Sequence, residues 1–198
     1  MAKGPVPRIS TQDAPAPSDP ALHRPVPLGR WLRLAALLVV LDQATKIAAQ
    51  SLMHFGERVD ILPFFDFTLI YNRGAAFSFL AQGDGWQRWF LSSIAVAAIA
   101  FILWLMKTQP QESRRMMLAL TLILAGAFGN LIDRLILGHV VDFLLFYWHP
   151  WYYPAFNIAD MAITLGAILL IWDELQRWRQ TRKSQRSGKS GPSDRSQP

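Results

Sequence analysis

Residues 86–106 read WQRWFLSSIAVAAIAFILWLM, and this stretch decides the fold class. No charged residue occurs from Trp89 to Met106. At about 1.5 Å of rise per residue, a helix of this length spans the roughly 30 Å hydrocarbon core of a bilayer. The stretch therefore predicts a transmembrane helix.

Three further apolar stretches have lengths close to a membrane span, at residues 31–52, 116–137 and 156–172. The chain has 198 residues, of which 52% are hydrophobic and 17% are charged. Four apolar stretches in so short a chain leave no amphipathic helices to cover them in water. We therefore predict an all-α membrane protein with four transmembrane helices, and the composition argues against a soluble enzyme or a disordered regulator.

The lysines and arginines are distributed unevenly along the chain. Residues 1–34, 107–115 and 173–198 hold 15 of the 20 Lys and Arg but 6 of the 14 Asp and Glu, a formal charge of +9. The positive-inside rule places these parts in the cytoplasm, so both termini are expected there and segments 53–85 and 138–155 outside. Since this orientation accounts for most of the net charge of +6, we expect no nucleic-acid partner.

The two ends of the chain have compositions that do not build a core. Residues 1–28 contain seven of the thirteen Pro and are predicted to be a disordered cytoplasmic extension. Residues 179–198 are rich in Ser, Gln, Lys and Arg and are predicted to be a disordered basic cytoplasmic tail. The membrane domain is expected over residues 29–178.

The two outer segments have different patterns. Residues 58–71, RVDILPFFDFTLIY, are rich in β-branched and aromatic side chains with partial alternation, which predicts short strands and makes 53–85 a small extracytoplasmic β-rich segment. Residues 140–151, VVDFLLFYWHPW, are too short to span and too apolar to remain in water. For segment 138–155 we therefore predict a short helix that lies in the membrane interface.

Polar residues inside the spans gather near one depth, towards the outer ends: Asp42, Lys46, Asn130, Asp133, Arg134, Asn157 and Asp160. Asp142 follows the third span at the same level. A charged side chain at the centre of a bilayer costs at least about 2.5–3.5 kcal/mol, so each of these residues needs a role. Asp42 with Lys46, at i,i+4, and Asp133 with Arg134 are predicted to form structural ion pairs.

Asp142 and Asp160 are left without a cation once those pairs have formed. Two carboxylates at one depth can share a proton, so that the ionised one activates a water and the neutral one protonates a leaving group. The residues alone leave two functions open, an aspartic hydrolase and a proton- or cation-coupled transporter. Asn130 and Asn157 would either hold the bundle together or position a substrate.

Other chemistries lack the residues that they need. The chain has no Cys, which excludes a thiol nucleophile and a thiolate metal site. The four His, at positions 23, 54, 139 and 149, are scattered and lie outside the spans, so the pattern of a zinc protease is absent. We expect neither a metal nor another cofactor.

Five short motifs occur in order along the chain: DQATK at 42–46, NRGAAF at 72–77, GNLIDR at 129–134, VDF at 141–143 and FNIAD at 156–160. Together they resemble the lipoprotein signal peptidase family, also called signal peptidase II, over residues 30–175. The resemblance implies an aspartic endopeptidase of the bacterial inner membrane. Such an enzyme removes the signal peptide of a prolipoprotein by cutting before a diacylglyceryl-modified Cys.

Carried over by motif, Asp142 and Asp160 match the catalytic pair of that family. The residues expected to shape the site and contact substrate are Asn72, Asn130, Arg134 and Asn157. The residues expected to support the structure are Asp42, Lys46, Asp133 and Gly129. The expected partners are a diacylglyceryl-prolipoprotein substrate and membrane lipids, and we expect the chain to be a monomer.

Overall fold

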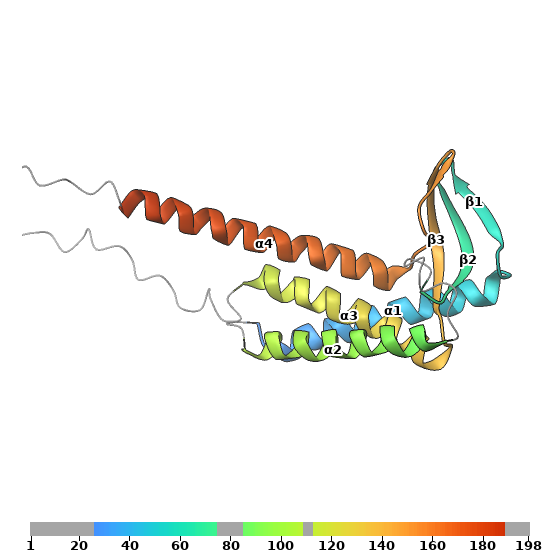
Figure 1. Cartoon of the computed structure of the whole chain (residues 1–198), viewed down its shortest axis with the longest axis horizontal. Coiled ribbons are helices and arrows are strands. Elements are labelled where there is room, and N and C mark those ends of the chain that lie inside the picture. Colours follow the sequence, from blue (N-terminus) through green and yellow to red (C-terminus); the bar gives the residue numbers. More distant parts are fainter. Residues whose placement is uncertain (1–25, 75–84, 109–112, 189–198) are drawn as a thin grey trace, which may run out of the picture.

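The computed structural model describes residues 26–74, 85–108 and 113–188 (Figure 1). Helices occupy the ranges α1 (Leu28–Leu52), α2 (Trp86–Thr108), α3 (Arg114–Ile136) and α4 (Ile158–Gly188). An antiparallel sheet lies across one end of the helices, and α4 runs past the other helices at the opposite end (Figure 1). Most of the predicted N-terminal extension and the last ten residues of the predicted tail lie outside the described residues.

Each predicted span corresponds to one helix. By length and composition, α2 and α3 are long and apolar enough to cross a membrane. The tail boundary at residue 179 is wrong, because α4 continues as a helix to Gly188. The segment after Trp172 is rich in Glu, Gln, Arg and Lys, which favour a helix although they are not apolar. The apolar pattern therefore ends before the helix does.

Helix α3 is the centre of the bundle and packs against α1, α2 and α4. Its contact with α4 is close because both helices carry glycine where they cross. A Cβ atom at Gly126 would clash with the carbonyl oxygen of Ala159, and one at Gly166 would lie 2.7 Å from the carbonyl oxygen of Ala119. Small residues of this kind allow helix backbones to approach each other in membrane proteins.

The sheet has the strand order β1 (Arg58–Leu62), β2 (Phe65–Asn72), β3 (Val140–Trp148) and β4 (Trp151–Tyr152). The strands predicted between residues 53 and 85 are confirmed. The short interfacial helix predicted for 138–155 is wrong, because that segment forms β3 and β4. Its β-branched and aromatic residues favour a strand, and pairing with β2 supplies the backbone hydrogen bonds that a helix would otherwise make internally.

The pairing of β2 with β3 gives the sheet one apolar face beside Asp142. Side chains alternate along a strand, so Asp142, Leu144 and Phe146 share a face of β3. Their partners on β2, which lie on the same face, are Ile70, Phe67 and Phe65. The ring centroids of Phe65 and Phe146 lie 5.1 Å apart. We call the five apolar residues of this face the apolar row, which consists of Phe65, Phe67, Ile70, Leu144 and Phe146.

Candidate active site

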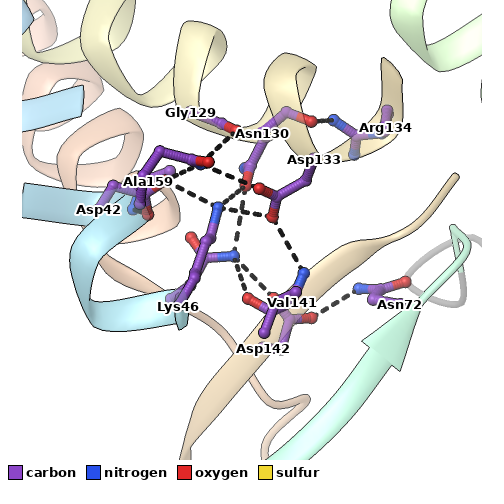
Figure 2. Close-up of polar contacts among 12 residues, drawn as sticks. Asp42, Lys46, Asn72, Gly129, Asn130, Asp133, Arg134, Val141, Asp142 and Ala159 are labelled. Atoms are coloured by element: carbon purple, nitrogen blue, oxygen red, sulfur yellow. Dashed lines mark hydrogen bonds and ion pairs between the residues drawn. The ribbon is translucent and has the colours of Figure 1, made fainter. Parts of the chain in front are cut away.

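Lys46 of α1 is the centre of a buried ion cluster (Figure 2). Its side chain is 2% exposed, and its Nζ atom lies 2.8 Å from Oδ2 of Asp42 and 2.9 Å from Oδ2 of Asp133. The same atom donates a hydrogen bond of 3.1 Å to Oδ1 of Asn130. One cation therefore pairs with two acids and ties α1 to α3.

The predicted pair of Asp42 with Lys46 is confirmed, whereas the predicted pair of Asp133 with Arg134 is wrong. Successive residues on a helix do not share a face, so Asp133 turns towards α1 and Arg134 turns away from it (Figure 2). Arg134 donates to the carbonyl oxygen of Asn130 at 3.2 Å. Arg134 forms no ion pair within the described residues, although the charges of Asp160, Asp133 and Asp142 all act on its guanidinium.

Asp133 and Asp42 also fix the backbone of the elements that carry the two candidate catalytic acids. Oδ2 of Asp133 accepts the N–H of Val141, the residue before Asp142 on β3, at 3.1 Å. Oδ1 of Asp42 accepts the N–H of Ala159, the residue before Asp160 on α4, at 2.9 Å. The ion cluster therefore holds the main chain next to both acids.

Gly129 and Gln43 complete the ion cluster. A Cβ atom at Gly129 would clash with the carboxylate of Asp42, so only glycine leaves room for the cluster. Nε2 of Gln43 donates to Oδ1 of Asp133 at 2.9 Å and to Oδ2 of Asp42 at 3.2 Å. Sequence reasoning missed Gln43, which carries no charge and could be singled out only by its place in the DQATK motif.

Asp142 of β3 is buried and receives a hydrogen bond on each carboxylate oxygen. Nδ2 of Asn157 donates to Oδ1 at 2.7 Å, and Nδ2 of Asn72 donates to Oδ2 at 2.9 Å. The N–H of Gly74 in turn donates to Oδ1 of Asn72 at 2.8 Å and orients that amide. Burial, and then the charge of Asp160, raise the pKa of Asp142 to about 7, so this carboxyl group is mostly protonated below neutral pH and can still exchange its proton at neutral pH.

Asp160 lies in the first turn of α4 and is partly exposed. Its Oδ1 accepts from Nδ2 of Asn130 at 2.7 Å, and its Oδ2 accepts from the N–H of Asn157 at 3.2 Å. Oδ1 of Asn157 accepts from the N–H of Asp160 at 3.0 Å. This reciprocal pair is a capping box, which fixes the side chain of Asp160 by the same bonds that begin the helix.

Asn157 joins the two acids into one network. Its Nδ2 atom, which donates to Asp142, also donates to Oδ1 of Asn130 at 3.3 Å. Asn130 in turn donates to Asp160 through its own Nδ2 atom. The structure thus brings nine of the ten predicted site residues into one connected cluster: Asp42, Lys46, Asn72, Gly129, Asn130, Asp133, Asp142, Asn157 and Asp160. Arg134 lies at its edge. Residues 75–77 of the NRGAAF motif lie outside the described residues.

The arrangement offers two carboxyl groups in different environments, one buried and one partly exposed. Within residues 26–74, 85–108 and 113–188, no three His, Asp or Glu side chains form a group that could hold a metal ion. Such a pair can donate and accept a proton in one reaction, which is the requirement for hydrolysis by an activated water.

A sequence model described as signal peptidase (SPase) II matches residues 34–176 of this chain. The chain belongs to the signal peptidase II family. A lipoprotein signal peptidase of Ralstonia nicotianae is 53% identical over 152 residues, which cover 77% of this chain and 87% of the relative. A lipoprotein signal peptidase of Burkholderia thailandensis is 50% identical over 155 residues, which cover 78% of this chain and 93% of the relative. The resemblance seen in the five motifs is confirmed.

Solved structures agree with this membership of the signal peptidase II family. One, described as a bacterial membrane enzyme structure at 2.3 Å resolution, matches with a TM-score of 0.69 and 32% identity, over 78% of this chain and 92% of that one. A second, at 1.9 Å, has the same TM-score and identity and covers 97% of its own chain. A mostly helical membrane fold with a small antiparallel sheet is therefore confirmed.

Proposed function

We propose that this signal peptidase II is an aspartic endopeptidase that removes the signal peptide of a prolipoprotein by cutting before a diacylglyceryl-modified Cys. The observation that carries the proposal is the meeting of Asp142 on β3 with Asp160 on α4 through Asn157 and Asn130. One acid lies on a strand and the other lies on a helix, yet a single hydrogen-bond network orients both side chains.

In this proposal Asp142 is the acid and Asp160 is the base. The raised pKa of Asp142 favours its neutral form, which can give up a proton at neutral pH. Asp160 accepts hydrogen bonds from Nδ2 of Asn130 and from the N–H of Asn157, and such bonds favour the ionised form of a carboxyl group and oppose the effect of its burial. The environments therefore support different protonation states for the two carboxyl groups.

The proposed reaction uses one water and restores both acids. Asp160 takes a proton from the water while the water oxygen bonds to the scissile carbonyl carbon. In the same step Asp142 gives its proton to the carbonyl oxygen. The resulting diol collapses when the C–N bond breaks. The leaving nitrogen then takes the proton from Asp160, and Asp142 takes one back from the diol.

The membrane arrangement that we propose has four spans, α1 to α4, with both termini in the cytoplasm of a bacterial inner membrane. Asp142 lies on β3 and Asp160 lies in the first turn of α4. The sheet lies at the end of the bundle where α4 begins (Figure 1), which is the extracytoplasmic end in this orientation. A diacylglyceryl-Cys is held at the same bilayer level by its acyl chains. The apolar row continues along the sheet from Asp142 and offers a surface for the apolar part of the substrate.

The proposal is tested by incubating the purified full chain, in detergent, with a synthetic signal peptide that carries diacylglyceryl-Cys. Mass spectrometry should find a single cut before the modified Cys. The matched control is the same peptide with unmodified Cys, which should be cut at least tenfold more slowly because the acyl chains no longer hold it at the site. A folded enzyme that leaves the lipidated peptide intact would refute the proposal.

A further inference from the structure

Exposed arginines gather at the end of α3 and α4 that lies opposite the sheet. We call this group the basic end, and it consists of Arg114, Arg115, Arg177, Arg179 and Arg182. Two of them share one buried acid: Nε of Arg115 lies 3.9 Å and Nε of Arg177 lies 2.9 Å from the carboxylate of Asp173. These side chains are 59% and 49% exposed. The five arginines outnumber the two acids beside them on α4, Asp173 and the exposed Glu174, so a net positive charge faces outwards.

The basic end is not explained by the stability of the helices. Positive charge in the first turn of α3 opposes the helix dipole, which favours negative charge there. Arg179 and Arg182 form no ion pair within the described residues. The excess charge is therefore available to a ligand.

An exposed apolar stripe on α4 leads to these arginines. Ile171, Leu175 and Trp178 are 68%, 40% and 50% exposed and follow one another at helical spacing, so they share one face. One turn further, the guanidinium carbon of Arg182 lies 3.8 Å from the ring centroid of Trp178. Along this face of α4, apolar side chains are followed by an aromatic ring and then by a cation. In a membrane leaflet the acyl chains, the interface and the charged headgroups follow one another in the same order.

The length of α4 places the change from apolar side chains to arginines at the edge of the hydrocarbon core. Trp178 lies 20 residues after Ile158, which is about 30 Å along a helix and equals the thickness of the hydrocarbon core. Asp173 of α4 lies beside Arg115 in the first turn of α3. Figure 1 shows that α4 continues beyond α3 at this end, so in the proposed orientation the part of α4 that follows this contact reaches the headgroup region.

We propose that the basic end binds the phosphate of an anionic phospholipid of the cytoplasmic leaflet, with an acyl chain along Ile171 and Leu175. The inference rests on the orientation given under Proposed function and concerns a site at the opposite end from the acids. Clustered arginines next to a transmembrane helix attract anionic headgroups, and each one adds a similar increment of binding.

The test is native mass spectrometry of the purified full chain in detergent, titrated with phosphatidylglycerol or phosphatidylcholine of identical acyl chains. Phosphatidylglycerol should bind at least tenfold more tightly. The variant Arg179→Gln/Arg182→Gln leaves the pairs of Asp173 in place and should weaken phosphatidylglycerol binding by about tenfold or more. The matched control, Arg30→Gln/Arg33→Gln on α1, removes the same charge and should change the affinity less than twofold.

Three results would overturn the inference: equal binding of the two lipids, equal loss in the α4 and α1 variants, and displacement of phosphatidylglycerol by an equal concentration of inorganic phosphate. The last would show that a free anion, not a lipid, fits the site. All variants should keep wild-type cleavage in detergent. A chain that binds phosphatidylglycerol selectively but fails to cleave the lipidated peptide would refute the proposed function and leave this inference intact.

Discussion

Replacing Lys46 with methionine should destabilise the protein strongly. Methionine fills a similar volume without a charge, so Lys46→Met removes the cation and leaves two carboxylates close together. Asp42 and Asp133 are 1% and 2% exposed, and water is excluded from both. The variant therefore creates two buried charges that no ion pair compensates.

The size of the loss in the free energy of unfolding depends on the hydrogen-bond partners that Asp42 and Asp133 keep. Breaking a buried ion pair by removing one partner costs about 3–5 kcal/mol. Asp42 keeps the N–H of Ala159, and Asp133 keeps the N–H of Val141, so we expect a cost of about 3 kcal/mol in the free energy of unfolding. For a chain of this size that corresponds to a fall in Tm of about 6–12 °C.

Thermal unfolding in detergent checks this, with Lys107→Met, at an exposed position near the end of α2, as the matched control. The triple variant Asp42→Asn/Lys46→Met/Asp133→Asn should recover most of the lost stability because no charge stays buried. It should not recover cleavage, since Lys46 also orients Asn130, the partner of Asp160. A Lys46→Met protein that melts within 2 °C of wild type would refute the reasoning.

Three further predictions concern the site and the orientation. Arg134→Ala should lower kcat at least tenfold yet shift Tm by under 3 °C, because Arg134 acts on the charge of Asp160 and forms no ion pair with Asp133. The pKa of Asp142 rises from 3.8 to about 7 on folding, so the folded chain keeps a proton that the unfolded chain has released. The Tm should therefore fall as pH rises through this window, and Asp142→Asn should reduce the fall. Reporter fusions should be extracytoplasmic at His149 and cytoplasmic at Lys107.

The helices and the two acids were predictable from the sequence for physical reasons. Long apolar runs have few alternatives to membrane helices, and an unpaired carboxylate at membrane depth is costly enough to imply function. The sequence therefore points to Asp142 and Asp160, although it does not show that the two lie close together.

Three features could not be predicted from the sequence. The choice of Lys46 over Arg134 as the partner of Asp133 depends on which helix face meets α1, and adjacency in sequence indicated the wrong pair. The residue types of β3 favour a strand, but its pairing with the edge of β2 is a contact between distant segments that no local pattern encodes. Gln43 acts through hydrogen bonds to residues on α3, and its type alone does not distinguish it from any polar helix residue.

The central claim is that Asp142 and Asp160 act as one catalytic pair, and kcat of the Asn variants on the lipidated peptide tests it most directly. Asp142→Asn and Asp160→Asn should each reduce cleavage to background, and the double variant should be no worse, because residues that act as a unit are not additive. Asp60→Asn, an exposed acid on β1, should retain wild-type cleavage. Each site variant should unfold within a few degrees of wild type or above it. Cleavage near the wild-type rate by a folded Asp142→Asn or Asp160→Asn protein would contradict the account.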